Sequence, residues 1–132
     1  KEKNSILEVV GKTNEVILQI NEILLTRVVF NLIYNALKFS YSNAIIKVLI
    51  EKTDGFLVIT VKDSGIGFDN SKKDELFKKF SSMGRLGTNN EKSTGVGLYL
   101  CHQIVKKFNG SIEAFSEGKD KGATFTVKFE LF

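Results

Sequence analysis

Proline and tryptophan are absent from this 132-residue chain, and cysteine and histidine occur once each. A single cysteine, Cys101, excludes an internal disulfide and favours a reducing compartment. No apolar run approaches the ~18 residues of a membrane span, and no segment resembles a signal peptide. We therefore expect a cytoplasmic domain, which leaves open whether its parent protein is membrane-anchored.

The composition is that of an ordinary globular domain, with 42% hydrophobic and 26% charged residues. The length corresponds to one domain, so we expect residues 1–132 to form a single unit with its own core. A net charge of +4 favours anionic ligands without implying nucleic acid, which we do not expect as a partner. The chain does not begin with methionine, and we expect an excised segment of a longer protein.

Hydrophobic periodicity predicts both helices and strands along the chain. The expected strands are 5–10, 15–20, 44–51, 56–62, 111–117 and 123–132, and a Gly-Lys-Thr-Asn turn at 11–14 separates the first two. The expected helices are 22–40, 72–79 and 95–109, the last of which ends at Asn109-Gly110. Asn21 is the expected N-cap of the first helix, Asp54-Gly55 predicts a hairpin turn, and the polar stretch 69–94 reads as a functional loop. We predict an α/β two-layer sandwich, in which about three helices cover one face of a mixed, mostly antiparallel sheet of about five strands.

Three polar residues share one face of the first predicted helix, within the segment "NLIYNALKFS". Asn31, Asn35 and Lys38 are spaced by four and three residues, which is helical spacing. An asparagine oxygen is a suitable ligand for Mg²⁺, and lysine offers a point charge to phosphate. Taken alone, the stripe is more typical of a solvated polar face of an amphipathic helix.

The segment "DSGIGF" follows a predicted strand directly. Gly65 and Gly67 permit a sharp turn and a close approach of the backbone to a ligand. The carboxylate of Asp63 could accept a hydrogen bond from an amino group such as that of adenine. A simple surface turn is the alternative.

The segment "STGVGLYL" lies where the long loop gives way to the last predicted helix. Free amide groups at a helix start bind phosphate, and Gly95 and Gly97 leave them exposed. The spacing matches neither the GxxxxGK[ST] phosphate loop nor a GxGxxG after a strand. Alone, this signal is weak.

The order of these segments resembles the catalytic ATP-binding domain of sensor histidine kinases. The asparagine helix is followed by "DSGIG", "LFKKF", a long lid, "GVGL" and a terminal strand pair. This family belongs with gyrase, the Hsp90 chaperones and the mismatch-repair ATPases to the superfamily that shares the Bergerat fold. The resemblance covers residues 15–131 and implies a mobile ATP lid over the site.

The resemblance implies a role for each matching position. Asn35 would coordinate Mg²⁺, Asn31 would line the phosphate side and Lys38 would contact a phosphate. Phe39 would pack against adenine, and Asp63 would accept from its amino group. Other positions implied to line the ATP site are Gly65, Ile66, Gly67, Phe80, Ser93, Thr94, Gly95, Val96, Gly97, Leu98 and Thr124. Phe77 and Phe80 would anchor the lid, and Arg85 is our choice for the γ-phosphate contact.

Several positions depart from the family pattern. Ser93 stands where a third glycine is usual, and Asn21 stands where aspartate is usual. The family's "FEPF" is "FKKF" here, and its "KFTP" is "KFSY". We expect these changes to affect lid motion and partner contacts more than ATP binding.

Asn31 decides between two chemistries that the superfamily supports. Its ATP hydrolases carry a glutamate at this position, whereas asparagine cannot take a proton at neutral pH. The resemblance therefore implies a protein histidine kinase that transfers the γ-phosphoryl group of Mg-ATP to a histidine in two-component signalling. An ATP hydrolase and a non-catalytic nucleotide-binding regulator are the alternatives.

The phosphoacceptor is the missing part of this prediction. The family's acceptor histidine lies on separate dimerisation helices, which we expect upstream in the parent chain. His102 reads as a surface or packing residue and Cys101 as a small core residue. We expect this segment to be monomeric and nearly inactive alone, the parent to be a homodimer, and a response regulator to act downstream.

Overall fold

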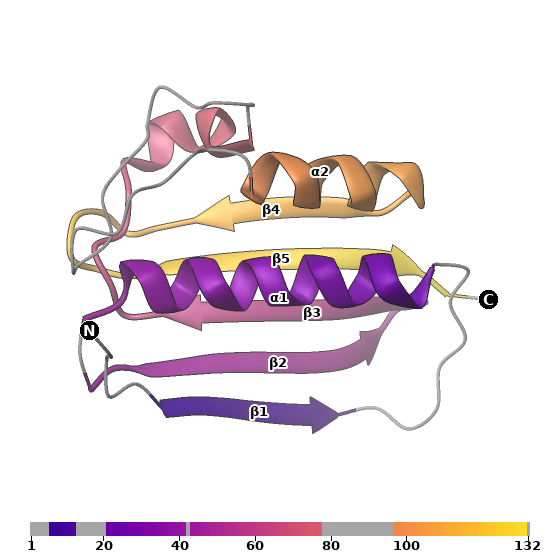
Figure 1. Cartoon of the computed structure of the whole chain (residues 1–132), viewed down its shortest axis with the longest axis horizontal. Helices are drawn as coiled ribbons and strands as arrows, with labels where there is room; N and C mark the ends of the chain where they lie inside the picture. Colours follow the sequence, from indigo (N-terminus) through magenta and orange to yellow (C-terminus); the bar gives the residue numbers. More distant parts are fainter. Residues whose placement is uncertain (1–5, 13–20, 42, 78–96, 132) are drawn as a thin grey trace.

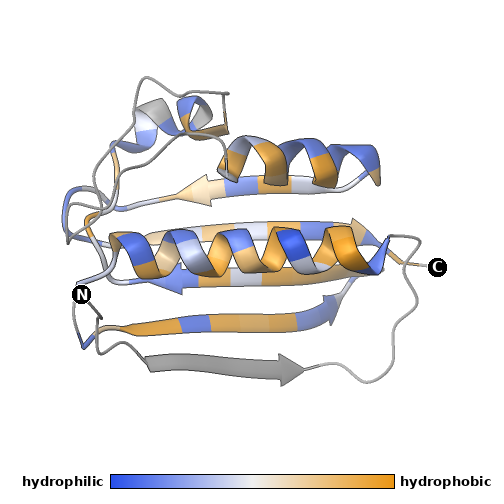
Figure 2. Ribbon diagram, viewed as in Figure 1, coloured by the Kyte–Doolittle hydropathy of each residue, from blue (hydrophilic) through white to orange (hydrophobic). Residues whose placement is uncertain are grey.

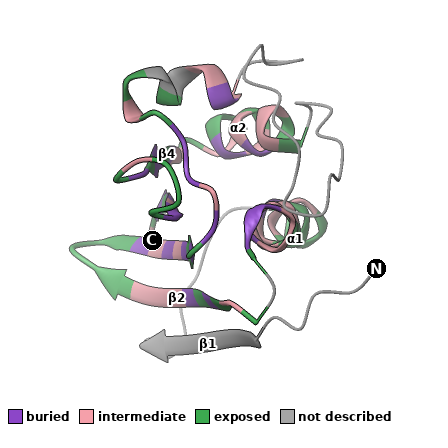
Figure 3. Ribbon diagram, turned by 90° about the vertical axis from the view of Figure 1, so that its left-hand side faces the viewer, coloured by how far each residue is buried: buried purple, intermediate pink, exposed green. Residues whose placement is uncertain are grey.

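The computed structural model describes residues 6–12, 21–41, 43–77 and 97–131. Its elements are β1 (Ile6–Lys12), α1 (Glu22–Phe39), β2 (Ile45–Thr53), β3 (Phe56–Asp63), the 3₁₀ segment η1 (Asn70–Phe77), α2 (Gly97–Lys107), β4 (Ser111–Phe115) and β5 (Ala123–Glu130). The strands form one sheet in the order β1-β2-β3-β5-β4. Helices α1 and α2 lie side by side on one face of it (Figure 1 and Figure 3). The predicted α/β class and the one-sided layering are confirmed.

The sheet is mixed and mostly antiparallel, as predicted. Strand β1 runs parallel to β2, whereas β2 with β3, β3 with β5 and β4 with β5 are antiparallel. The β2–β3 hairpin turns at Asp54 and Gly55, whose φ angles are 49° and 80°. The two-residue hairpin turn that the Asp-Gly pair predicts has positive φ at both of its central residues.

Helix α1 begins and ends where the sequence predicts. The side-chain oxygen of Asn21 accepts hydrogen bonds from the amides of Ile23 at 2.8 Å and Leu24 at 3.2 Å. These bonds satisfy two of the amide groups that a helix start leaves unpaired, so Asn21 caps as expected. The buried side chains Val28, Leu32 and Ala36 recur every four residues, and Figure 2 shows polar and apolar residues following each other along the helix.

Helix α2 ends at the predicted Asn109-Gly110 pair. Asn109 has a φ of 61° and donates to the Lys106 carbonyl at 3.1 Å, while Gly110 donates to the Val105 carbonyl at 2.9 Å. This pair of bonds is the Schellman arrangement, in which the left-handed residue is more often glycine.

The core lies between the sheet and the two helices. Alternate residues of β2 and β3 point into it, as the predicted pattern requires: Ile46, Val48, Leu57, Ile59 and Val61. Strand β5 adds Phe125, Val127 and Phe129, and α2 adds Cys101 and Val105. Cys101 is fully buried, which confirms its assignment as a core residue.

Two predicted elements are wrong in part. The turn expected at 11–14 begins too early, because Gly11 and Lys12 still pair with β2. The short helix expected at 72–79 is the 3₁₀ segment η1, which packs against α2 and β4. The strand expected at 15–20 and the lid lie outside the described residues. No helix in the described part of the chain is long and apolar enough to cross a membrane.

Candidate functional site

Asp63 places a carboxylate where the sheet pattern calls for an apolar side chain. It continues the buried face of β3 that carries Ile59 and Val61, and only 4% of it is exposed. Its Oδ1 accepts hydrogen bonds from the amides of Gly65 at 2.8 Å and Ala123 at 3.2 Å. Burying a carboxylate is costly unless hydrogen bonds replace its water, and two backbone amides do so here. The fold therefore holds this carboxylate in a fixed position at the end of β3.

The loop after Asp63 needs glycine for close backbone contact. A Cβ added to Gly65 would lie 1.8 Å from the carbonyl oxygen of Phe39, and one added to Gly67 would lie 2.3 Å from that of Gly118. Gly67 also has a φ of 65°. The amide of Ile66 donates to the Phe39 carbonyl at 3.0 Å, which joins the loop to the last residue of α1. The two glycines thus bring the loop against α1, as the close-approach interpretation requires.

The polar stripe of α1 is half-buried at Asn31, Asn35 and Lys38. The thiol of Cys101 on α2 donates to the Val28 carbonyl of α1 at 3.7 Å. Burial raises the pKa of this thiol to about 11, and the Asn31 side chain offsets part of that rise. The thiol therefore stays neutral at physiological pH. Asn31 is a half-buried neutral amide rather than a fully solvated surface residue.

Asn35 carries a buried polar atom without a partner. Its Nδ2 is buried and has no hydrogen-bond partner among the residues that the structure describes. Buried polar groups are normally paired, so an unpaired amide on this stripe indicates a ligand, an ion or ordered water nearby. Asparagine oxygens are among the hard, neutral ligands that suit Mg²⁺. The unpaired group is an NH₂ donor, which would meet an acceptor such as a phosphate or water oxygen, so a role in holding Mg²⁺ depends on the amide oxygen of Asn35. The described residues contain no group of three His, Cys, Asp or Glu suited to bind a metal ion.

Lys38 and Phe39 lie together at the end of α1. The Lys38 ammonium lies 5.5 Å from the centre of the Phe39 ring and 5.9 Å from that of Tyr34. Both distances are within the range of cation–π attraction, which holds the ammonium at this end of the helix. The ring of Phe39 is buried beside the loop that follows Asp63.

The described part of the second glycine segment opens α2. Leu98 packs against the core, and a Cβ added to Gly97 would meet no described atom within 4 Å. Packing against described residues therefore does not require glycine at position 97. Phe80, Arg85, Ser93, Thr94, Gly95 and Val96 lie outside the described residues.

Phe77 and His102 pack against each other. Their ring centres are 5.8 Å apart, and Phe77 also meets the buried Phe125 edge-on at 6.3 Å. Phe77 therefore ties η1 to α2 and to β5. The contact agrees with the expectation that His102 is a packing residue.

Thr124 is the site residue that the structure places elsewhere. It stands opposite the exposed Lys62, on the sheet face away from the helices, whereas Ala123 stands opposite Asp63. Because side chains alternate along a strand, Thr124 points away from the Asp63 carboxylate. The amide of Ala123, rather than the Thr124 side chain, is the group of β5 that meets this carboxylate, and a contact of Thr124 with adenine stays a prediction.

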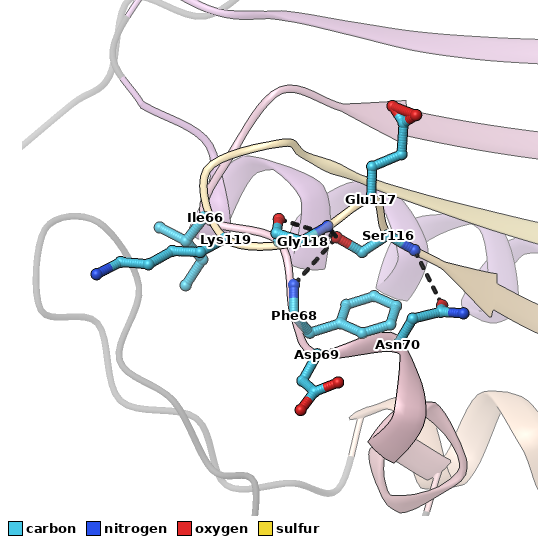
Figure 4. A pocket seen from close by; sticks show the side chains of 9 residues that line it. Ile66, Phe68, Asp69, Asn70, Ser116, Glu117, Gly118 and Lys119 are labelled. Carbon is cyan, nitrogen blue, oxygen red and sulfur yellow. Dashed lines mark hydrogen bonds between the residues drawn. The ribbon is translucent and has the colours of Figure 1, made fainter.

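Sequence reasoning missed the segment between β4 and β5. The buried Ser116 hydroxyl donates to the Gly122 carbonyl at 2.6 Å and accepts from the amides of Phe68 at 3.2 Å and Gly118 at 3.1 Å. Figure 4 shows it at the centre of the residues that line a cavity of about 590 Å³. The lining residues are Ile66, Gly67, Phe68, Asp69, Asn70, Ser116, Glu117, Gly118 and Lys119. The sequence signal that could have identified this segment was a serine between a strand and a glycine-rich turn.

The sequence profile of the histidine kinase-, DNA gyrase B- and HSP90-like ATPase family matches residues 20–132. The chain belongs to this family. Its ATP-binding members include the sensor histidine kinases, so the predicted family is confirmed.

The relatives within this family are sensor kinases. The sensor histidine kinase RppB of Synechocystis is 30% identical over 112 residues, which cover 85% of this chain and 24% of that protein. RcsC of Escherichia coli is 35% identical over 109 residues, 82% of this chain and 11% of that protein. The chain thus spans a quarter or less of these relatives, and it corresponds to their ATP-binding catalytic domain.

Solved structures show the same fold. A mycobacterial sensor histidine kinase, MprB, superposes with a TM-score of 0.83 over 97% of this chain and 83% of that chain, at 21% identity. The catalytic domain of the histidine kinase ThkA gives 0.79 over 96% of this chain and 80% of that chain, at 20% identity. The arrangement of sheet and helices is therefore that of histidine kinase catalytic domains.

Proposed function

We propose that this domain binds Mg-ATP and donates the γ-phosphoryl group to a histidine on separate dimerisation helices of the parent protein. The observation that carries the proposal is the position of Asn31. It lies one helical turn before Asn35 on the same stripe, and it is a half-buried amide that carries no carboxylate. A proton acceptor for water is thus missing at this position, so the bound nucleotide should persist until an acceptor arrives.

The adenine end of the site would be formed by Asp63. A carboxylate has about four lone-pair sites on its two oxygens, so it can accept from a nucleobase amino group as well as from backbone amides. The exocyclic amino group of adenine is such a donor, whereas guanine presents a carbonyl oxygen at the same place. We therefore expect ATP to be preferred over GTP.

The phosphate end would be formed by the stripe of α1 and the start of α2. Asn35 would hold Mg²⁺, and Lys38 would contact a phosphate from the same helix. Mg²⁺, when bound, supplies charge neutralisation on the phosphates, and phosphoryl transfer depends mainly on such stabilisation and on positioning. Arg85 remains our choice for the γ-phosphate contact.

The proposal is tested by supplying the acceptor. The domain, mixed with Mg-ATP and the histidine-bearing helical hairpin of the parent protein, should yield acid-labile phosphohistidine on the hairpin. Rapid phosphate release by the domain alone would instead indicate an ATP hydrolase. Failure to bind ATP, with Asp63→Asn changing nothing, would indicate a non-catalytic regulator. If the hairpin becomes phosphorylated, a response regulator would be the next acceptor of the phosphoryl group.

A further inference from the structure

A side-chain hydrogen bond joins two segments that are 79 residues apart. The Tyr41 hydroxyl donates to the Asp120 carboxylate at 2.5 Å. Tyr41 follows the end of α1 by two residues, and Asp120 lies in the turn between β4 and β5. The bond therefore links the helix that carries the polar stripe to the turn beside the cavity.

Together with two backbone hydrogen bonds, this bond closes a ring of hydrogen bonds around Ile66. The Ile66 amide donates to the Phe39 carbonyl at 3.0 Å, and the Ile66 carbonyl accepts from the Asp120 amide at 2.8 Å. Asp120 then accepts from Tyr41, which lies two residues beyond Phe39. Both backbone groups of Ile66 are thereby held between α1 and the β4–β5 turn.

The β4–β5 turn has three residues with positive φ and a second contact to the loop after Asp63. Asp120 has a φ of 61°, in a region that residues other than glycine rarely adopt, and Gly118 and Gly122 have φ values of 126° and 76°. The Gly122 amide donates to the Gly65 carbonyl at 3.1 Å, so the turn supports the loop after Asp63 at a second point. Any displacement of this turn would be passed to that loop.

We propose that Tyr41 and Asp120 act as a positioning pair that fixes the loop from Asp63 to Gly67 for nucleotide binding. This inference rests on the proposed function, since it assigns the pair to the adenine end of that site. Neither residue needs to touch the nucleotide, because the ring through Ile66 transmits their effect. The raised pKa of Tyr41, caused mainly by the hydrogen bond to Asp120, agrees with a hydroxyl that keeps its proton for this bond.

The matched variant is Tyr41→Phe, which removes the hydroxyl and keeps the ring. A bond to a charged acceptor is stronger than a neutral one, but this one is exposed to water, so we expect a roughly 3- to 10-fold loss of ATP affinity. Asp120→Ala should cause a similar loss, and the double variant should be no worse than the poorer single variant. Asp120→Asn keeps an oxygen acceptor and should retain most of the affinity. Glu113→Ala removes an exposed carboxylate on β4 that takes part in neither the ring nor the proposed site, and it is the control.

Two measurements separate this inference from the function on which it rests. Amide hydrogen exchange without nucleotide should quicken at Ile66 and Asp120 in Tyr41→Phe, whether or not the protein binds ATP. Unchanged exchange rates would contradict the positioning role of Tyr41 and Asp120, even if ATP binds as proposed. Faster exchange with unchanged ATP affinity would show that the ring does not position the site. Independent, additive losses in the double variant would also contradict the pair, whereas absence of ATP binding to the unaltered protein would refute the proposed function itself.

Discussion

The backbone of Ala123 on β5 donates a hydrogen bond to the side chain of Asp63 on the neighbouring strand β3, at 3.2 Å. The same carboxylate oxygen accepts from the Gly65 amide at 2.8 Å. One buried carboxylate therefore fixes the end of two strands and the first turn of the loop between β3 and η1. Under the proposed function the same residue would also recognise adenine, and substitutions there should separate the two roles.

Substitution of Asp63 by asparagine should weaken ATP binding and spare the fold. The amide oxygen can still accept from Gly65 and Ala123, but the adjacent NH₂ group would face the adenine amino group as a second donor. We expect an affinity loss of about 10²-fold with little change in melting temperature. Calorimetric titration with ATP beside a thermal melt measures both.

The matched variant Asp63→Ala removes the acceptor altogether. The amides of Gly65 and Ala123 would then be buried without a partner, at a cost of about 1–3 kcal/mol each. We expect a clear loss of stability in urea unfolding. Equal stability of the alanine and asparagine variants would show that the two amide bonds contribute nothing.

Substitution of Gly65 by alanine should destabilise the domain. The new methyl group would lie 1.8 Å from the Phe39 carbonyl oxygen, so α1 and the loop would have to separate. We expect a loss of roughly 3 kcal/mol or more, measured by denaturant unfolding. Gly97→Ala is the stability control, because its methyl group would meet no described atom within 4 Å. Comparable stability of the two variants would contradict the close approach.

Substitution of Asn31 by glutamate should turn the site toward hydrolysis. A carboxylate at this position could accept a proton from water, and a general base contributes about 10²–10⁴-fold to such reactions. We expect phosphate release by the isolated domain to rise, with Asn31→Gln as the neutral control of the same length. Steady-state phosphate release is the measurement, and an equal rate in both variants would count against the assignment of Asn31.

The buried thiol of Cys101 should make stability fall in alkaline solution. Its pKa rises from 9.0 to about 11 on folding because burial penalises the thiolate. The folded protein keeps the proton more tightly than the unfolded chain, so this contribution is complete below pH 9 and is lost as the pH rises through 11. Two pKa units correspond to about 2–3 kcal/mol. Urea unfolding between pH 8 and 11 should show a steeper decline than in Cys101→Ala, and parallel declines would refute the shift.

Much of the fold could be predicted from local patterns. Element boundaries could be recognised at Asn21, Asp54-Gly55 and Asn109-Gly110, because capping and turn chemistry depend on neighbouring residues. The alternation along β2 and β3 also identified the buried face correctly. The start of η1 and the length of β1 were less certain, because short segments carry little periodic signal.

Contacts between distant segments were beyond sequence reasoning. Tyr41 was visible as a departure from the family pattern, but its partner Asp120 is 79 residues away. The direction of the Thr124 side chain could not be predicted, because one residue along a strand reverses it. The orientation of β5 had to be known before Ala123 could be recognised beside Asp63.

The fate of the γ-phosphoryl group tests the proposed function most directly. With γ-labelled ATP, Mg²⁺, this domain and the histidine-bearing hairpin of the parent protein, the label can be followed onto protein and into free phosphate. We predict that label appears on the hairpin as acid-labile, alkali-stable phosphohistidine, faster than it appears as free phosphate, and that Asp63→Asn prevents this. Release of free phosphate at the same rate with or without the hairpin, and no label on protein, would contradict phosphoryl transfer.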